Sequence, residues 1–214
     1  MLYTSTRDNS IRVSAAQAIA QGISEEGGLF VPVELPHFDI EKIASMASMN
    51  YIDRAKTVLK EYLTDFTEEE LDYCVSGAYA AQKFSSPQIA PTVNVDGNKN
   101  ILELWHGPTC AFKDMALQLL PYLMTVSAKK TADGKTIVIL VATSGDTGKA
   151  ALEGFKNVDN TKILVVCPVD GVSPMQKLQM TTQEGENVAV CAINGNFDDA
   201  QSAVKSIFTN NDIK

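Results

Sequence analysis

Residues 136–155 read TIVILVATSGDTGKAALEGF, and this stretch holds a complete strand, turn and helix start. A strand is predicted over 136–142, where the residues after Thr136 are continuously apolar, which is typical of a strand buried on both faces of a sheet. The turn SGDTG follows at 144–148, and the residues after it predict a helix over about 147–156. A buried strand joined by a short turn to a helix indicates an α/β fold.

The same pattern recurs twice further along the chain. Continuous apolar strands are predicted over 162–167 and 187–193, and helices are predicted over about 174–183 and 197–208. Unbroken apolar strands that alternate with helices imply a parallel sheet with helices on both of its faces. We therefore expect this part of the chain to be of the α/β class.

The sequence before residue 90 is mainly helical in pattern. A helix over 14–20 is predicted to start on a serine cap and to end before a glycine. Two further helices are predicted at about 51–63 and 67–82. The second begins at Thr67, where the sequence has the pattern of a capping box.

The pattern changes after residue 90. Residues 92–95 and 101–105 flank an Asp-Gly turn, which predicts a hairpin. A helix over about 111–128 follows it. We place the domain boundary near residue 90, so that a mainly helical domain covers 1–90 and a second domain covers 91–214.

Composition excludes several classes of function. The net charge is −8 and the basic residues are dispersed, so a nucleic-acid partner is not expected. The four cysteines are far apart and there are only two histidines, which argues against a metal site and against a disulfide framework. No apolar run approaches the roughly 18 residues of a membrane span, and the start has no signal-peptide core. A cytoplasmic protein without membrane partners is expected.

The turn at 144–148 is the first candidate for chemistry. It lies at the carboxyl end of a predicted parallel strand, where ligands of open α/β sheets bind. The helix after it offers backbone N–H groups and a positive dipole end to an anion. A turn in which Asp146 or Thr147 merely caps the helix fits the pattern equally well, so both interpretations stay open.

Lys113 is the second candidate, in the predicted first turn of the helix over 111–128. The helix dipole disfavours a positive charge there, which favours the neutral amine that Schiff-base chemistry requires. A lysine in a helical stretch is more often a solvated surface residue. His106, in the preceding loop, is by itself more often a hydrogen-bonded loop residue than a base. Spacing alone therefore does not identify an enzyme.

Taken together, these segments resemble one family. HGPTCAFKD over 106–114 resembles the lysine motif that binds pyridoxal phosphate (PLP) in threonine synthases, and ATSGDTGKAA over 142–151 resembles their cofactor-flanking loop. The starts at 3–7 and 28–32 resemble the small N-terminal domain of the longer-chain bacterial and fungal branch. The stretch GVSPMQK over 171–177 also has a counterpart in the family.

The resemblance implies a PLP enzyme of the tryptophan-synthase-β fold, with 1–90 as the family's N-terminal domain and 91–214 as part of its catalytic domain. The implied reaction converts O-phospho-L-homoserine and water to L-threonine and phosphate, the last step of threonine biosynthesis. Lys113 would be the catalytic residue and would hold PLP as a Schiff base. The cofactor-binding residues implied are Lys113, Ser144, Gly145, Asp146 and Thr147. Since relatives in the wider fold carry Asn where this chain has Asp146, the contact made by Asp146 is left open.

The family's chains continue well beyond Lys214. The resemblance implies that the loop receiving the PLP phosphate lies there, and that Gly195-Asn196-Phe197 belongs to a strand–helix junction instead. We therefore expect the 214-residue chain to be an inactive portion that does not retain PLP, and to self-associate through exposed apolar surface.

Two alternatives stay open beside a threonine synthase. One is another PLP enzyme of the same fold, such as a threonine dehydratase, although the start at 3–7 and the SGDTG loop count against it. The other is a module that keeps the fold without the chemistry.

Overall fold

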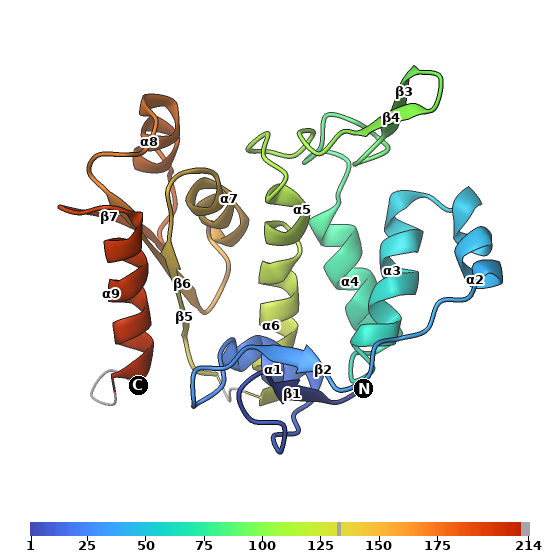
Figure 1. Cartoon of the computed structure of the whole chain (residues 1–214), viewed down its shortest axis with the longest axis horizontal. Coiled ribbons are helices and arrows are strands. Elements are labelled where there is room, and N and C mark those ends of the chain that lie inside the picture. The colour runs from blue at the N-terminus through green and yellow to red at the C-terminus, as the bar shows by residue number, and fades with distance from the viewer. Residues whose placement is uncertain (132–133, 211–214) are drawn as a thin grey trace. The chain divides into compact units, whose positions relative to one another are not determined.

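The computed structural model describes residues 1–131 and 134–210 (Figure 1). The chain forms two compact units. Unit 1 comprises Met1–His106 and Tyr122–Gly134, and unit 2 comprises Gly107–Pro121 and Lys135–Lys214. The expected domain boundary near residue 90 stays a prediction.

Unit 2 contains the parallel sheet that the apolar runs predicted. Its strands are β5 (Ile137–Ala142), β6 (Thr161–Pro168) and β7 (Val188–Ile193), in the order β5-β6-β7. Both pairings are parallel, and β6 is the most buried of the three strands. The α/β expectation is confirmed.

Helices cover both faces of this sheet. Helices α7 (Asp146–Phe155) and α8 (Pro174–Thr181) contact each other, and Gly148 of α7 packs on Val165 of β6 and on Met180 of α8. Helix α9 (Phe197–Thr209) lies on the opposite face, where Ala200 and Val204 pack around Val166 (Figure 1). The predicted helices over 147–156, 174–183 and 197–208 are confirmed within two residues at each end.

The single helix expected over 111–128 is wrong, because the chain forms two helices there. They are α5 (Asp114–Leu117) and α6 (Leu120–Thr131). Pro121 explains the break, since proline has no N–H to donate and its ring would clash with the carbonyl four residues earlier, that of Leu117. That carbonyl lies instead against Gly154 of α7.

Replacing Gly154 by alanine should destabilise unit 2 by about 1–3 kcal/mol, because a Cβ there would overlap the backbone carbonyl oxygen of Leu117. Urea denaturation followed by circular dichroism would measure the change. Glu153→Ala, one residue earlier in α7, removes only a partly exposed pairing with Lys149 and should cost less than about 0.5 kcal/mol. Equal losses for the two variants would contradict the packing described.

Unit 1 begins with two short strands that join the predicted N-terminal motifs. Strand β1 (Tyr3–Ser5) pairs antiparallel with β2 (Phe30–Pro32), and the buried hydroxyl of Ser5 donates to the carboxylate of Glu26. Hydrogen bonds from Ser5 and then Ser24 lower the pKa of Glu26. Helix α1 (Ala15–Gln21) follows β1 and has the expected serine cap.

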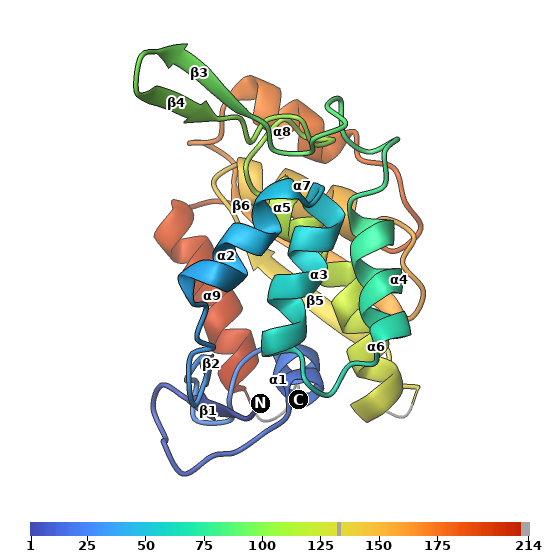
Figure 2. The same cartoon turned by 90° about the vertical axis from the view of Figure 1, so that its right-hand side faces the viewer.

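The helical core of unit 1 consists of α3 (Tyr51–Tyr62), α4 (Glu68–Ala78) and α6. Helices α3 and α4 lie side by side (Figure 2). The Thr67 capping box at the start of α4 is confirmed, but α4 ends at Ala78 rather than near 82. Helix α6 packs on α4: the Tyr122 ring meets Tyr73 edge-on at 5.5 Å between centroids and fills the space beside Gly77.

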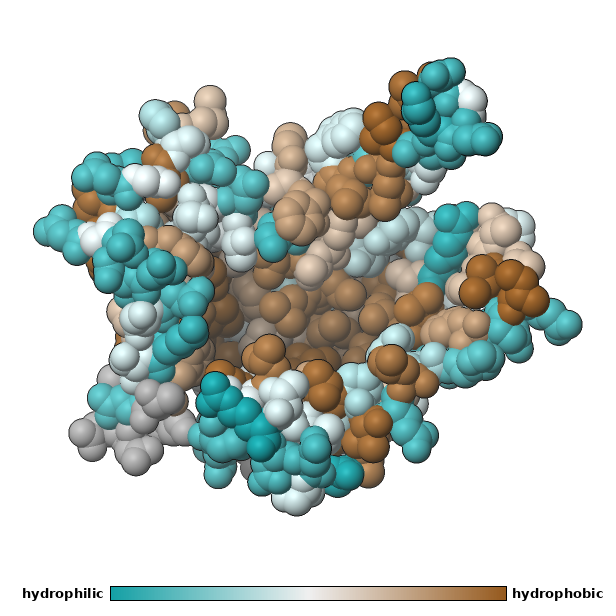
Figure 3. Space-filling view, viewed as in Figure 1, coloured by the Kyte–Doolittle hydropathy of each residue, from teal (hydrophilic) through white to brown (hydrophobic). Residues whose placement is uncertain are grey.

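Two parts of unit 1 carry exposed apolar side chains (Figure 3). Helix α2 (Ile40–Ser45) and the 3₁₀ turn after it (Met46–Ser48) bury no residue, and Ile40 is 76% exposed. Strands β3 (Thr92–Asp96) and β4 (Lys99–Leu102) form the predicted hairpin, whose residues are exposed throughout. In the described part of the chain, no helix is long and apolar enough to cross a membrane.

The four cysteines should fall into two reactivity classes. Cys110 and Cys191 are exposed, whereas Cys74 and Cys167 are buried. Burial raises the pKa of the Cys74 thiol to about 12 and also raises that of Cys167, so both have little of the reactive thiolate. Ellman's reagent at about pH 8 should modify the two exposed thiols quickly and the buried pair only after unfolding. A Cys110→Ser variant should lose one fast thiol. Four equally fast thiols would contradict the burial of Cys74 and Cys167.

Candidate functional site

Lys113 closes a tight loop that leads into α5. It is the residue immediately before this helix and not within its first turn. Its Nζ lies 4.5 Å from the centre of the exposed Phe112 ring, and in the described residues no carboxylate forms an ion pair with it. The amine is thus partly exposed and not committed to a structural salt bridge.

The buried carboxylate of Asp114 organises this loop from within. It is fully buried and accepts hydrogen bonds from the backbone N–H of Thr109 at 2.9 Å and from its hydroxyl at 2.7 Å. Gly107 must be glycine, because a Cβ there would lie 2.5 Å from Asp114. Cys110 takes a positive φ of 58° to complete the turn. The loop is therefore fixed on both sides of Lys113.

The turn at 144–148 is organised by the buried hydroxyl of Thr143. Its Oγ1 accepts from the backbone N–H of Gly145 at 3.0 Å and from that of Gly148 at 2.9 Å. Gly145 has φ 152°, a backbone conformation that residues other than glycine rarely adopt. Gly145 occupies the N-cap position of α7, so in the described structure the cap residue has no side chain that accepts a hydrogen bond from this helix start.

The start of α7 therefore offers backbone donors. A helix leaves its first N–H groups without intrahelical acceptors, and here Thr143 takes up the N–H of Gly148 but not those of Asp146 and Thr147. The side chains of Ser144 and Asp146 are exposed beside them. Of the two interpretations of this turn, capping by Asp146 or Thr147 is wrong. The anion contact remains a prediction.

In unit 2, the Lys113 loop and the 144–148 turn precede two helices that pack together. Helix α5, which follows Lys113, packs against α7, which follows the turn. The loop before α5 and the loop between β5 and α7 both open at the upper end of these helices in Figure 1. The contact between α5 and α7 thus places the Lys113 loop and the 144–148 turn at the starts of two neighbouring helices.

Comparison with known proteins finds relatives that match almost the whole chain. The family model described as "Threonine synthase N terminus" matches residues 2–79. The threonine synthase of Pseudomonas aeruginosa is 40% identical over 210 residues, which cover 97% of this chain and 44% of that protein. The chain belongs to the threonine synthase family.

Solved structures of the family share its fold. A PLP-bound threonine synthase from Brucella melitensis matches 99% of this chain and 45% of its own, with a TM-score of 0.87 and 38% identity. The yeast threonine synthase matches with a TM-score of 0.87 and 34% identity, over 44% of its chain. This chain spans about half the length of the threonine synthases it matches.

Gln176 is a contact of the candidate site that the sequence did not reveal. Its Nε2 donates to Oδ1 of Asp146 at 2.6 Å from the first turn of α8, thirty residues further along the chain. The stretch 171–177 was recognised only as a counterpart of a threonine synthase segment. A polar residue just after the second parallel strand was the available signal, because such positions meet at one edge of the sheet.

His106 is a hydrogen-bonded loop residue of unit 1. Its Nδ1 lies 2.9 Å from the hydroxyl of Ser85, and its Nε2 lies 2.7 Å from the carboxylate of Glu103. The backbone N–H of Ser85 also donates to the carbonyl oxygen of His106 at 2.9 Å. These bonds account for both ring nitrogens, as expected for a residue that holds a loop in place.

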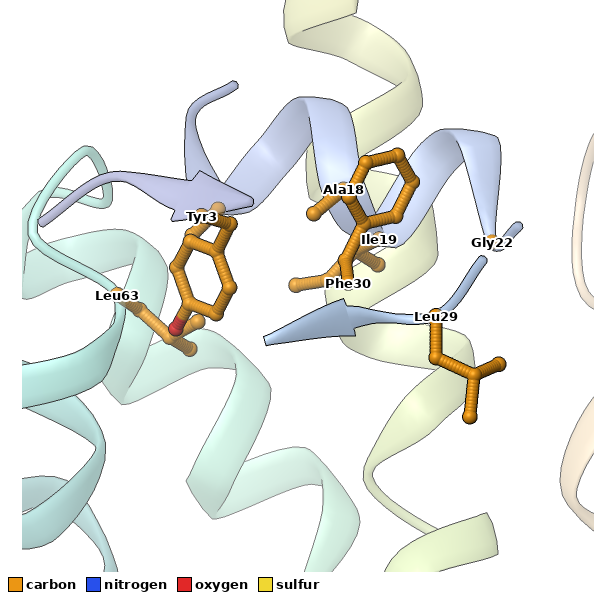
Figure 4. Close-up of a pocket in the computed structure, with 8 residues that line it drawn as sticks. Tyr3, Ala18, Ile19, Gly22, Leu29, Phe30 and Leu63 are labelled. Carbon is orange, nitrogen blue, oxygen red and sulfur yellow. The ribbon is translucent and has the colours of Figure 1, made fainter. Parts of the chain in front are cut away.

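Unit 1 also contains an apolar hollow of about 320 Å³, lined by Tyr3, Ala18, Ile19, Leu29, Phe30 and Leu63, among others (Figure 4). Its polar group is the Tyr3 hydroxyl, which donates to the carbonyl oxygen of Tyr62 at 2.9 Å. Burial, and then the charge of Asp65, raise the pKa of Tyr3, so this hydroxyl stays protonated. The hollow has the character of a packing space and not of a reaction site.

Gly195-Asn196-Phe197 lies at the junction of β7 and α9, as expected. Asn196 caps α9 by accepting from the backbone N–H groups of Asp198 and Asp199, and Asp199 completes a capping box. These contacts occupy the N–H groups that a phosphate would require.

Proposed function

We propose that this chain supplies the PLP-binding lysine and the cofactor-flanking loop of a cytoplasmic threonine synthase, which converts O-phospho-L-homoserine and water to L-threonine and phosphate. The observation that carries the proposal is the placement of Lys113 and the 144–148 turn at the starts of two helices that pack together in unit 2. Family membership and the printed title of the PLP-bound relative support it.

Lys113 would have two tasks. Its Nζ would first hold the cofactor and would then, once the substrate amine has replaced it, carry protons between substrate carbons. When bound, PLP supplies an electron sink for the electrons of the broken C–H bond. The Asp114–Thr109 bonds would keep the amine at a fixed position between these steps, which is what repeated proton transfer at one atom requires.

The 144–148 turn would bind and orient polar groups. The Ser144 hydroxyl and the N–H groups of Asp146 and Thr147 are suited to oxygen atoms that carry negative charge. The Asp146 carboxylate only accepts hydrogen bonds when ionised, so the group opposite it must be a donor. Gly145 allows the backbone to approach a flat ring closely.

Product analysis tests this function. The protein as its gene encodes it, whether 214 residues or longer, is incubated with PLP and O-phospho-L-homoserine. Equal amounts of threonine and phosphate are expected from a protein that continues beyond Lys214, and neither product is expected from the 214-residue chain alone. Phosphate release without threonine, or formation of 2-oxobutanoate from added threonine, would contradict the proposal. Either result would indicate an eliminating enzyme of the threonine dehydratase type.

We further propose that the 214-residue chain self-associates. Val138 on β5 and Met175 and Leu178 on α8 are large apolar side chains that are more than half exposed, which favours association in water. Sedimentation at several concentrations should show a mass that rises above 23.1 kDa. A constant monomer mass would contradict this.

A further inference from the structure

Gln176 connects α8 to the turn that begins α7. Its side-chain amide fills the space beside Gly145, where a Cβ would lie 2.5 Å from it, and donates to Oδ1 of Asp146 at 2.6 Å. Helices α7 and α8 pack together on the same face of the sheet (Figure 1). One side chain thus contacts both the strained glycine and the acidic residue of the turn.

Ser173 fixes which end of the Gln176 amide faces Asp146. The Ser173 hydroxyl donates to Oε1 of Gln176 at 2.9 Å, and Ser173 Oγ also accepts from the Gln176 backbone N–H at 3.3 Å. A reversed amide would place Oε1 against the Asp146 carboxylate, where two acceptors would repel each other. The chain of bonds therefore runs in one direction, from Ser173 through Gln176 to Asp146.

This arrangement leaves one oxygen of Asp146 for a ligand. Gln176 occupies Oδ1, and in the described residues no hydrogen bond involves Oδ2. An exposed carboxylate on a short side chain has several rotamers, and an amide bound to one oxygen restricts them. Restricting a contact group before the ligand arrives removes part of the entropy cost of binding.

We propose that Gln176 is a positioning residue of the cofactor site. It holds the Asp146 carboxylate and the Gly145 turn in the orientation that meets PLP, with Ser173 setting the direction of its amide. This rests on the proposed function, because Asp146 is a cofactor contact only if Lys113 holds PLP.

The test compares Gln176→Met, which keeps the volume but removes the amide, with Gln179→Met on the same helix. Both are made in the protein as its gene encodes it, and circular dichroism checks that they fold. Gln176→Met should weaken PLP binding about tenfold or more, because it removes a hydrogen bond to a charged group. Gln179→Met should leave binding unchanged. Amide hydrogen exchange without PLP should quicken at Gly145 and Gly148 in Gln176→Met alone.

A second variant separates positioning from packing. Gln176→Glu has nearly the same shape, but at neutral pH it places a carboxylate against Asp146. As the pH falls, the two carboxyl groups can share a proton and restore a donor. Since the usual pKa of a carboxyl group is about 4 and a neighbouring carboxylate raises it, PLP affinity of Gln176→Glu relative to the unmodified protein should recover between about pH 7 and pH 5. Packing alone would give no such pH dependence.

The outcomes are distinct. Unchanged PLP affinity in Gln176→Met would overturn the proposal, as would a loss of affinity in Gln176→Glu that does not vary with pH. If PLP affinity is too weak to measure, unchanged exchange at Gly145 and Gly148 would overturn it. If Lys113 is not the residue that PLP modifies in the unmodified protein, the proposed function fails as a whole. If Lys113 is modified and the Gln176 variants behave normally, only this inference fails.

Discussion

Replacing Lys113 by alanine should abolish covalent attachment of PLP. Sodium borohydride fixes the bond between a lysine amine and PLP, and peptide mapping then locates it. In the protein as its gene encodes it, we expect the label at Lys113 and its loss in Lys113→Ala. Threonine formation should fall by several orders of magnitude, because one group would both hold the cofactor and transfer protons.

Two controls sharpen this result. Lys113→Arg keeps a positive charge near the Phe112 ring but cannot form the bond, so it should fail as completely as alanine. Lys177→Ala removes an exposed lysine of α8 and should leave labelling intact. Label that persists in Lys113→Ala at the same extent would transfer the catalytic role to another lysine.

Leu152→Ala should cause a large loss of stability in unit 2. Leu152 is fully buried in unit 2. Truncating a buried leucine removes its transfer free energy and leaves a cavity, which costs about 2–5 kcal/mol. This is a large share of the roughly 5–15 kcal/mol that stabilises a typical domain. Urea denaturation followed by circular dichroism would measure the shift.

Leu178→Ala is the matched control, since it deletes the same atoms from a helix of the same unit. Leu178 is 56% exposed on α8. Its loss should change the free energy of unfolding by less than about 0.5 kcal/mol. If both leucines cost the same, the core of unit 2 is not where the structure places it.

The parallel sheet could be predicted from the sequence because its signal is local and strong. Three continuous apolar runs and the helices between them agree with β5, β6 and β7. The break at Pro121 was missed, because the apolar pattern continues on both sides of the proline and outweighed its effect on the backbone. Helix α2 was missed for the opposite reason: it is six residues long and buries none of them, so no periodic pattern marks it.

For the candidate site, too, some features could be predicted from the sequence and others could not. Lys113 and the 144–148 turn lie in contiguous motifs and could be identified from sequence, and their roles stay predictions. The hydrogen bonds of Asp114 and of Gln176 could not be predicted. The first depends on how the loop before α5 folds back, and the second joins two residues that are thirty positions apart in the sequence. Local sequence does not specify such contacts.

The order in which the chain enters the two units matters during synthesis on the ribosome. Unit 1 is completed only by Tyr122–Gly134, which emerge after Gly107–Pro121 of unit 2. Until then Tyr73 lacks the ring of Tyr122, and Glu70 lacks Lys130, its partner at 2.7 Å. Until α6 has been synthesised, the apolar surface of unit 1 that α6 covers is therefore exposed to solvent. Chaperones bind nascent chains that expose such surface. No single cut of the chain separates the two units intact.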